Sequence, residues 1–246
     1  MTTDRLRLDQ LLVERGLYAS RARARDAIAR GQVTVAGKVI DKPGQLVSPD
    51  AEIAVVDPAA RYVSRSALKL KAALDAFSIA VAGRICLDVG ASTGGFTQVL
   101  LEHGAAHVTA IDVGHGQMSP VVGLDPRVTS IEGLNARDLA ADHLSQPPEI
   151  VVADVSFISL RLALPPALNL AVPGASGAFL VKPQFEVGRD NVGKGGLVRD
   201  EAVALASVEG IAAFLEDQGW RVIGRIASPI AGGDGNQEYL LGARKA

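Results

Sequence analysis

The segment Leu87–Leu101 (LDVGASTGGFTQVLL) carries residue types whose spacing fits two kinds of chemistry. Gly90, Ser92 and Gly94 fit the G-x-S-x-G pattern, in which a nucleophilic serine sits on a sharp turn between a strand and a helix. The same segment also predicts a strand, a glycine turn and a helix N-terminus, a common seat for a nucleotide-like cofactor. A hydrolase of that type needs a histidine well downstream of its serine, but no histidine follows His143. We therefore favour the cofactor interpretation.

The turn also indicates which cofactor it would hold. In the dinucleotide-binding turn G-x-G-x-x-G, the second glycine lets a pyrophosphate approach the backbone, and Ser92 occupies that position here. Asp112 ends the next predicted strand, where a carboxylate can bind ribose hydroxyls, and Asp88 could face a positive centre, although either acid alone could simply cap a turn or end a strand. S-adenosylmethionine has a ribose and a sulfonium but no phosphate at this turn. The residues that we expect to bind it are Asp88, Gly90, Ala91, Ser92, Thr93, Gly94, Gly95, Phe96, Asp112 and Asp154.

The chain lacks the motifs of two classes of methyltransferase, and this narrows the choice of atom that accepts the methyl group. Carbon-5 methylation of pyrimidines generally uses a cysteine nucleophile, but the only cysteine, Cys86, lies inside a predicted buried strand. Methylases of exocyclic amines usually carry an Asn/Asp-Pro-Pro-Tyr type of motif, and the corresponding segment here, DVSFIS from Asp154 onward, has no proline. A hydroxyl acceptor therefore remains the leading choice.

A ribose hydroxyl is a weak nucleophile, so its methylation needs alignment with the sulfonium and a route for the proton. A lysine can accept that proton only if its pKa falls well below about 10.4. The candidate cations at element ends are Lys69 and Lys182, and the candidate acids are Asp154 and Glu238. Because the carboxyl ends of parallel strands share one edge of a doubly wound sheet, Asp154 and Lys182 should lie near the cofactor. This argument does not place Lys69 or Glu238.

The segments that must position these residues alternate between strands and helices. Apolar runs predict strands at residues 84–90, 107–114, 128–133, 149–157, 177–185, 220–230 and 238–245. Helical spacing at residues 94–104, 160–170 and 199–219 separates several of them. This alternation predicts an α/β domain with a doubly wound, mostly parallel seven-stranded sheet, and we expect the last two strands to form an antiparallel edge.

The first 60 residues predict a small α+β unit in front of this domain. Leu6–Glu14 carries leucines at helical spacing, and Ser20 can cap a second helix that runs to about Arg30. A hairpin that turns at Ala36-Gly37 follows, and then two further short strands. We therefore expect a small domain at residues 1–60, a larger domain at residues 61–246 and a linker at about residues 57–65.

The charge of the chain is unevenly distributed. The formal net charge of the whole chain is −2. Basic residues outnumber acidic residues over residues 1–71, and acidic residues outnumber basic residues in the remainder. Arg21 and Arg23 fall in the first turn of the second predicted helix, where a cation opposes the helix dipole by about 0.3–1 kcal/mol. Folding gives no reason for that placement, whereas a polyanionic partner does; a solvated charged face is the plainer alternative.

Several stretches of the chain resemble known families. Residues 7–40 (RLDQLLVERGLYASRARARDAIARGQVTVAGKVI) are similar to the small RNA-binding domain named after the fourth protein of the small ribosomal subunit. The stretches SRSALKL, LDVGASTGGFTQVLL, VVADVSF and LVKPQFE resemble motifs of the FtsJ-like ribose 2′-O-methyltransferases. Taken together, nearly the whole chain resembles the TlyA (hemolysin A) family of rRNA (cytidine-2′-O)-methyltransferases.

This resemblance implies a Rossmann-like class I methyltransferase domain behind a small RNA-binding domain. It implies that Lys69, Asp154, Lys182 and Glu238 form a K-D-K-E tetrad, in which the second lysine is the base and the other three tune it and position the ribose. It further implies S-adenosylmethionine-dependent 2′-O-methylation of a ribose, expected to be a cytidine, in rRNA of ribosomal subunits. The residues expected to meet that RNA are Arg5, Arg7, Arg21, Arg23, Arg25, Arg30, Lys38, Lys42 and Arg65.

Composition argues against several other classes. A single cysteine excludes an internal disulfide, a CxxC zinc site and a cysteine-ligated iron–sulfur cluster. The charged start MTTDRLRLDQ lacks an apolar signal core, and the apolar stretch Leu160–Val181 contains Arg161 and three prolines. We expect a cytoplasmic protein without metal or membrane partner, and a monomer is favoured. Two alternatives remain: a non-catalytic ribosome-binding or assembly factor, and a membrane-active hemolysin.

Overall fold

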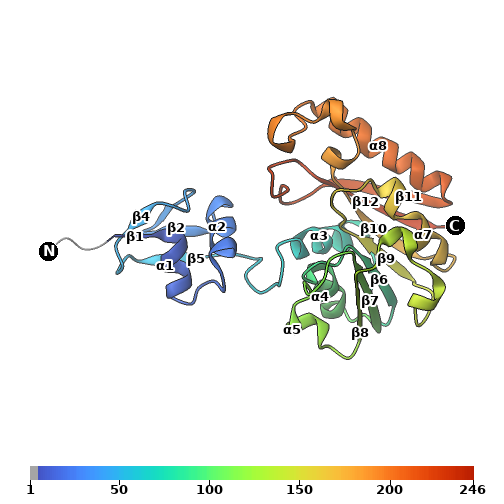
Figure 1. Ribbon diagram of the computed structural model, residues 1–246, viewed down its shortest axis with the longest axis horizontal. Coiled ribbons are helices and arrows are strands. Elements are labelled where there is room, and N and C mark those ends of the chain that lie inside the picture. The colour runs from blue at the N-terminus through green and yellow to red at the C-terminus, as the bar shows by residue number, and fades with distance from the viewer. Residues whose placement is uncertain (1–4) are drawn as a thin grey trace. The chain divides into compact units, whose positions relative to one another are not determined.

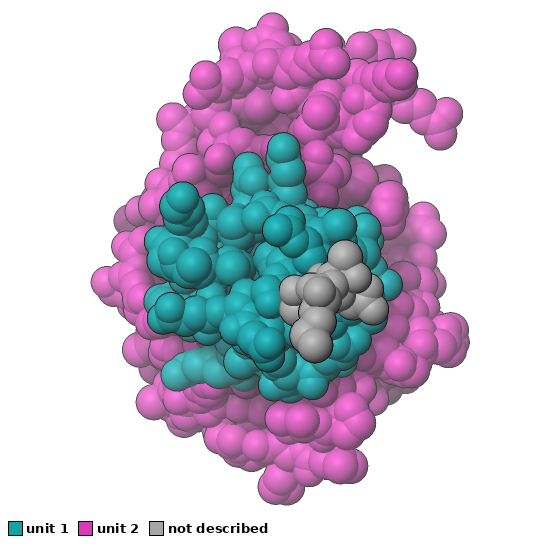
Figure 2. Space-filling model, turned by 90° about the vertical axis from the view of Figure 1, so that its left-hand side faces the viewer, with its two compact units in different colours: residues 1–61 teal, residues 62–246 magenta. Residues whose placement is uncertain are grey.

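The computed structural model describes residues 5–246, and the chain forms two compact units that divide between Arg61 and Tyr62 (Figure 1). Figure 2 colours them separately, residues 1–61 and residues 62–246. Each unit has its own hydrophobic core, so each is described by itself.

The first unit contains two helices and short antiparallel strands. β1 pairs with β4, and β2 lies between β3 and β5. Ser20 Oγ accepts a hydrogen bond from Arg23 N and caps α2, as predicted. Ala36 and Gly37 both have positive φ, 47° and 74°, which a two-residue hairpin turn between β2 and β3 requires. The elements are β1 (Leu6–Arg7), α1 (Leu8–Glu14), α2 (Arg21–Ala29), β2 (Val33–Val35), β3 (Lys38–Val39), β4 (Leu46–Val47) and β5 (Ile53–Val55).

The second unit is built on a seven-stranded sheet with the order β11-β12-β10-β9-β6-β7-β8. All its strands are parallel except β12, which pairs antiparallel with both β10 and β11. The predicted doubly wound, mostly parallel sheet is therefore confirmed. The last two strands do form an antiparallel pair, but β12 is inserted between β10 and β11. The strands are β6 (Ile85–Val89), β7 (His107–Asp112), β8 (Val128–Glu132), β9 (Ile150–Ala153), β10 (Ser176–Val181), β11 (Trp220–Ala227) and β12 (Tyr239–Lys245).

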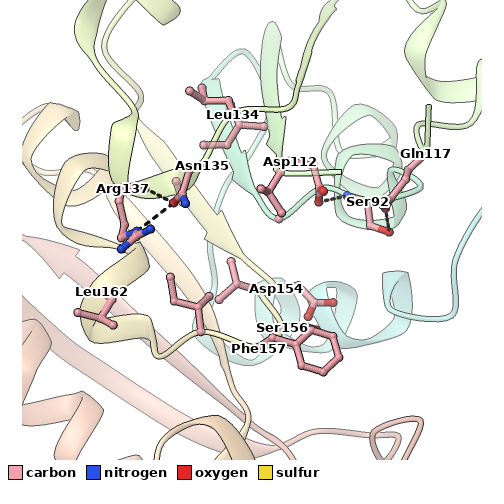
Figure 3. Close-up of a pocket in the computed structure, with 16 residues that line it drawn as sticks. Ser92, Asp112, Gln117, Leu134, Asn135, Arg137, Asp154, Ser156, Phe157 and Leu162 are labelled. Carbon is pink, nitrogen blue, oxygen red and sulfur yellow. Dashed lines mark hydrogen bonds between the residues drawn. The ribbon is translucent and has the colours of Figure 1, made fainter. Parts of the chain in front are cut away.

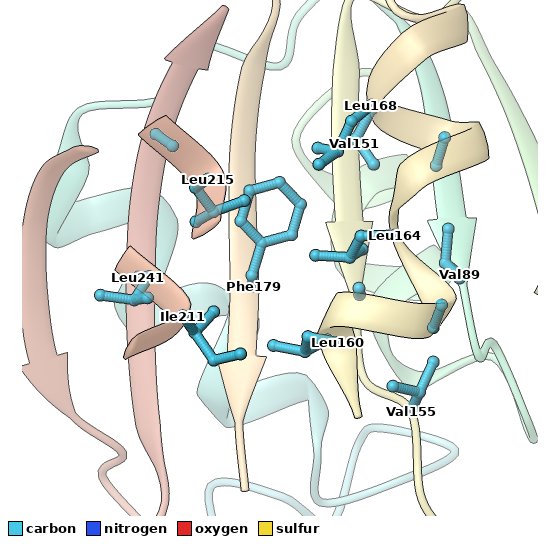
Figure 4. Packing of buried hydrophobic residues seen from close by; sticks show 14 of the residues in the cluster. Val89, Val151, Val155, Leu160, Leu164, Leu168, Phe179, Ile211, Leu215 and Leu241 are labelled. Atoms are coloured by element: carbon cyan, nitrogen blue, oxygen red, sulfur yellow. The ribbon is translucent and has the colours of Figure 1, made fainter. Parts of the chain in front are cut away.

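Helices cover both faces of this sheet. On one face, Leu160, Leu164 and Leu168 together with Ile211 and Leu215 pack on inward side chains of the strands (Figure 4). The opposite face is covered by α3 and α4, whose apolar residues join Cys86 and its neighbours in a second core. Burial on both faces explains why the strands read as near-continuous apolar runs. The helices are α3 (Ala67–Phe77), α4 (Gly95–Glu102), α5 (Pro120–Gly123), α6 (Leu160–Ala163), α7 (Pro165–Leu170) and α8 (Glu201–Asp217).

The strand order reverses between β6 and β9, and this switch point positions the site. The chain runs from β6 outward to β7 and β8, then returns to β9 and β10 on the other side of β6. At the carboxyl ends the two strands remain in register, since Asp154 N donates to Val89 O at 3.0 Å. Ligands of doubly wound sheets bind in the crevice outside such a point.

Candidate active site

The glycine turn follows β6 directly at the switch point. Gly90 has φ 84°, and a Cβ there would lie 2.6 Å from the backbone oxygen of Asp154, so only glycine allows the two strand ends to approach so closely. Ser92 also lies in the left-handed region, with φ 47°. A Cβ at Gly95, the first residue of α4, would lie 2.6 Å from Ser66 Oγ. The turn is therefore shaped by backbone contacts on several sides.

Asp112, at the end of β7, fixes the far side of this turn. Its carboxylate accepts from Ser92 N at 2.8 Å and from Gly114 N at 2.7 Å. Ser92 Oγ donates to Gln117 Oε1 at 3.1 Å, which joins the turn to the segment after β7. Glu132, at the end of β8, in turn accepts from the backbone N–H groups of Gly116, Gln117 and Met118.

A cavity of about 720 Å³ opens beside this turn (Figure 3). Ser92 and Asp112 lie on one side of it, and Ser156 and Phe157 lie on another. Apolar side chains alternate with a few polar groups along the wall, which is typical of a site for a small organic ligand. The lining residues that follow strand ends or short turns are Gly90, Val113, Leu134, Asn135, Asp154 and Val155.

The acids around the turn suit a positively charged ligand. Asp88 is fully buried, and its Oδ2 accepts from Thr97 Oγ1 at 2.6 Å, while its Oδ1 has no hydrogen-bond partner among the described residues. Burial raises the pKa of Asp88 to about 7; the bond from Thr97 opposes this shift, and the charges of Asp154 and Asp112 add to it. Three carboxylates at one turn, with an unpartnered oxygen, fit the ammonium and sulfonium of S-adenosylmethionine.

The four predicted catalytic residues form two lysine–carboxylate pairs. Lys182 Nζ lies 2.7 Å from Asp154 Oδ1 and donates to Ser156 Oγ at 2.8 Å. The contact with Asp154 is an ion pair without hydrogen-bond geometry, so this Oδ1 also lacks a hydrogen-bond partner in the described chain. Lys69 Nζ, from α3, pairs with the carboxylate of Glu238 just before β12, and both side chains are buried. The structure thus places all four predicted catalytic residues in two pairs.

Two smaller cavities connect these pairs with the glycine turn. A cavity of about 150 Å³ is lined by residues of the turn together with Asp154 and Lys182. Another of about 450 Å³ is lined by Lys182 and Glu238. Ser156 borders both of these and the large cavity. Lys182 therefore stands between the side where a cofactor would lie and a second side, which we call the acceptor cavity.

Most of the predicted cofactor residues lie along these cavities. Asp88, Gly94 and Gly95 are buried and line none of the three. Phe96 packs in the core below the turn, and its neighbour Cys86 is buried, which raises the pKa of its thiol to about 12. The predicted residues that border a cavity are Gly90, Ala91, Ser92, Thr93, Phe96, Asp112 and Asp154.

The sequence analysis missed several residues at the site. Ser156 and Phe157 lie two and three residues after Asp154, and a serine just after a predicted buried strand was a usable signal. Phe157 has a 91% exposed ring and a positive φ of 65°, and its ring centroid lies 5.2 Å from that of Phe185. Ser64 and Ser66, which border the small cavity, lie within the stretch SRSALKL but were not singled out. Glu132 had no distinguishing pattern in the sequence.

Several arginines of the first unit make contacts that stabilise its fold. The expectation that folding gives no reason for Arg21 and Arg23 in the first turn of α2 is therefore wrong. Arg7 and Arg21 pair with the buried Asp9, and Arg30 binds Asp26 and Asp57 with its side chain largely covered. Arg23 donates to backbone oxygens of residues 59 and 60. The predicted RNA-contacting residues of this unit that are exposed on its surface are Arg5, Arg7, Arg21, Arg25, Lys38 and Lys42.

Arg65, the last of these predicted residues, belongs to the second unit. A Cβ at Gly233 would lie 3.6 Å from Arg65 Nη2, which places this guanidinium beside the segment that leads to Glu238. Among residues 5–246, no group of three or more His, Cys, Asp or Glu could hold a metal ion. No helix within the same range is long and apolar enough to cross a membrane.

A doubly wound sheet with one reversed strand and a cofactor cavity at its switch point is the fold of class I methyltransferases. An S-adenosylmethionine-dependent methyltransferase of Mesorhizobium loti shares this fold with a TM-score of 0.53 at 16% identity, over 71% of this chain and 96% of that one. The model of the FtsJ-like methyltransferase family matches residues 62–245, and that of the S4 domain matches residues 6–53. The chain belongs to the FtsJ-like methyltransferase family and, within it, to the TlyA proteins.

Two relatives span nearly the full chain. The 16S/23S rRNA (cytidine-2′-O)-methyltransferase TlyA of Mycobacterium tuberculosis is 48% identical over 241 residues, which are 98% of this chain and 90% of that protein. The solved structure of a Streptococcus thermophilus protein, described as a candidate hemolysin, is 39% identical with a TM-score of 0.78. The match covers 100% of this chain and 90% of that one. These similarities confirm the predicted family, and with it a methyltransferase preceded by an S4 domain.

Proposed function

We propose that this methyltransferase transfers a methyl group from S-adenosylmethionine to the 2′-hydroxyl of a ribose, that of a cytidine, in rRNA within ribosomal subunits. The name of the Mycobacterium tuberculosis relative supports the substrate, at 48% identity over nearly the full chain. The observation that carries the proposal is the place of Lys182, which borders both the cavity at the glycine turn and the acceptor cavity. A base for methyl transfer needs this position, between donor and acceptor.

The residues of the large cavity would hold the cofactor. Asp112 ends β7 with a carboxylate that can accept hydrogen bonds from ribose hydroxyls, and Asp154, which also lines the cavity, can supply negative charge for the ammonium and sulfonium. When bound, S-adenosylmethionine supplies an electrophilic methyl group on its sulfonium. Ser92 stands where the dinucleotide-binding turn needs its second glycine for a pyrophosphate, and S-adenosylmethionine carries no phosphate.

The lysine–carboxylate pairs would handle the proton and the acceptor ribose. Lys182 Nζ, after losing its own proton, is the atom that would take the proton of the 2′-hydroxyl, and Asp154 and Ser156 hold that atom in place. Glu238 faces the acceptor cavity and can accept a hydrogen bond from a neighbouring ribose hydroxyl. Lys69, which is also buried, pairs with the Glu238 carboxylate and orients it. Alignment and proton transfer are the two requirements of an oxygen nucleophile that these residues meet.

The S4 domain would supply affinity for RNA rather than chemistry. Its exposed cations can neutralise phosphates in a sequence-independent way, and this type of binding weakens with salt. The methyltransferase unit, which carries Arg65, would then select the ribose.

The experiment is transfer of labelled methyl groups from S-adenosylmethionine to purified ribosomal subunits, with the modified ribose mapped on the rRNA. We expect the wild-type protein to label a cytidine 2′-oxygen. Lys182→Ala should reduce transfer by about 10²–10⁴-fold, the usual contribution of a general base, while calorimetry still detects cofactor binding. Lys71→Ala is the matched control, since Lys71 is an exposed lysine on α3 paired only with Asp75. Full activity of Lys182→Ala would overturn the assignment of the base.

The same measurements separate the alternatives. A non-catalytic ribosome-binding factor would bind subunits without transferring any methyl group, and absence of cofactor binding in the calorimeter would favour it. A membrane-active hemolysin would lyse cells as a purified protein, and nothing in the described helices favours that activity over methyl transfer.

A further inference from the structure

Three segments from different parts of the chain surround the acceptor cavity. The first is the turn η3 (Pro183–Phe185) after β10, and the second is the loop of residues 186–199 between η3 and α8. The third is the segment of residues 228–237 that leads from β11 to Glu238. All three contribute residues to the wall of the cavity, which also contains Lys182 and Glu238.

Both longer segments are rich in glycine, and several of these glycines have positive φ. Gly188, Gly195, Gly196 and Gly235 have φ between 77° and 90°. Glycine loses more conformational freedom on ordering than any other residue, so these segments need specific contacts to keep one shape. The turns η4 (Arg189–Asn191) and η5 (Lys194–Gly196) within the loop are each only three residues long.

Asn236 supplies such contacts from a buried position. Its side chain is 3% exposed, and both of its polar atoms bind the backbone of the loop: Oδ1 accepts from Val198 N at 2.9 Å, and Nδ2 donates to Gly196 O at 2.8 Å. Its own backbone oxygen accepts from Gly232 N at 2.8 Å. One amide therefore joins the loop to the segment that ends at Glu238.

A second bond joins the same segment to η3. Gln184 Nε2 donates to Asp234 Oδ2 at 3.1 Å, and the other carboxylate oxygen of Asp234 accepts from Asn236 N at 3.1 Å. A carboxylate can only accept, so the amide of Gln184 is oriented by this bond. The two bonds together connect all three walls of the acceptor cavity.

We propose that Asn236 is a positioning residue for the methyl acceptor: it ties the glycine-rich loop to the segment before Glu238 and so fixes part of the wall of the acceptor cavity. Asn236 lines none of the three cavities, so it acts through the loop rather than on the substrate. This role rests on the proposed 2′-O-methylation. The proposal also implies that different residues hold the two parts of the site. Asn236 holds the wall of the acceptor cavity, whereas Asp112 and Glu132 hold the segments beside the glycine turn, where the cofactor would lie.

The test compares Asn236→Ala with wild type in methyl transfer to ribosomal subunits. The variant leaves Val198 N and Gly196 O without their partner. Because two buried hydrogen bonds are lost, we expect the KM for subunits to rise at least about tenfold. The dissociation constant of S-adenosylmethionine should stay unchanged, because the cofactor side is not touched. A general loss of structure would change both quantities, so this split distinguishes positioning from stability.

Limited trypsin digestion supplies an independent readout. The loop contains Arg189, Lys194 and Arg199, and trypsin should cleave there faster in Asn236→Ala than in wild type. Asn191→Ala is the matched control: Asn191 lies in the same loop but donates only within it, to Val187 O, so its KM should stay at the wild-type value. Gln184→Met removes the second bond and should raise the KM in the same direction.

The outcomes separate the two proposals. An active wild-type protein with unchanged KM and unchanged trypsin cleavage in Asn236→Ala would overturn the role of Asn236 and leave the proposed function standing. A wild-type protein that binds cofactor but methylates no subunit would overturn the proposed function and the positioning role with it. A raised KM with unchanged cofactor binding and faster cleavage supports both.

Discussion

Lys182 Nζ lies 2.7 Å from Asp154 Oδ1, and the two residues follow neighbouring parallel strands of the sheet. The register between β9 and β10 sets this contact, because Ala153 pairs with Phe179 and Lys182 extends just beyond the end of its strand. A one-residue slip of either strand would turn one of the two side chains to the opposite face. The chemistry of the site thus depends on the pairing of two buried strands.

The buried pair of Lys69 and Glu238 gives a prediction about stability and activity together. The side chains are 6% and 3% exposed, so Lys69→Met leaves an uncompensated buried charge and should lower the free energy of unfolding by about 3–5 kcal/mol. The double variant Lys69→Met/Glu238→Gln should recover most of that stability in urea unfolding but not methyl transfer. Lys71→Met, which breaks an exposed pair, should cost less than about 1 kcal/mol. A double variant with wild-type activity would contradict this prediction.

The buried carboxyl group of Asp88 should make the free energy of unfolding depend on pH. Burial raises its pKa to about 7 in the folded protein, against about 3.9 in an unfolded chain. The folded state therefore holds a proton that the unfolded state releases between about pH 4 and pH 7, and the free energy of unfolding should fall as pH rises through that range, by up to about 1.4 kcal/mol per unit. Asp88→Asn should remove this fall, as measured by urea unfolding in a pH series.

The exposed Asp75 provides the control for that series. Asp75→Asn should leave the wild-type pH dependence in place, because Asp75 pairs at the surface with Lys71. Parallel curves for wild type and Asp88→Asn would refute the assignment of the proton to Asp88.

Substitution of Glu132 should change the affinity for the cofactor but not for the ribosomal subunits. Its carboxylate accepts three backbone N–H groups of residues 116–118, and these bonds, led by that of Met118, hold the pKa of Glu132 below its usual value. Glu132→Gln keeps the size but loses the charge, so the segment that carries Gln117 should loosen from the glycine turn. Calorimetry should show the dissociation constant of S-adenosylmethionine rising several-fold, with the KM for subunits unchanged. Glu216→Gln, at an exposed position on α8, should change neither constant.

Substitution by alanine should affect RNA binding at Arg25 but stability at Arg30. Arg25 is exposed on α2, so Arg25→Ala should weaken binding to subunits and reduce the slope of log K against log salt by about one, without loss of stability. Arg30 binds Asp26 and Asp57, so Arg30→Ala should destabilise the S4 domain. Filter binding at several salt concentrations and thermal unfolding measure the two effects. Equal salt slopes for wild type and Arg25→Ala would remove this arginine from the RNA-binding surface.

Much of the fold and half of the tetrad could be predicted from local patterns. Apolar strands alternating with helices indicate a doubly wound sheet, and in such a sheet Asp154 and Lys182 must meet because both follow parallel strands. Lys69 and Glu238 could not be placed in this way. Lys69 reaches the site from a helix, and Glu238 precedes β12, whose reversed direction brings the beginning of a strand to the edge where the other strands end.

The contacts that hold loops could not be predicted at all. Asn236 and Glu132 have no periodicity or motif around them, and their roles depend on which backbone groups another segment presents. The role of Arg30, which directly follows α2, could not be predicted either. In the sequence it resembles the exposed arginines of this segment, and only the structure shows that it binds Asp57.

The reversed strand β12 also has a consequence for biosynthesis. Lys69 and Glu238 are 169 positions apart, and the pair closes only when β12 inserts between β10 and β11. A nascent chain that has already emerged as far as Lys182 therefore carries the glycine turn and the base but lacks the partner of Lys69. The four-residue arrangement of Lys69, Asp154, Lys182 and Glu238 is therefore complete only after the strand that follows Glu238 has been synthesised and has paired with β10 and β11.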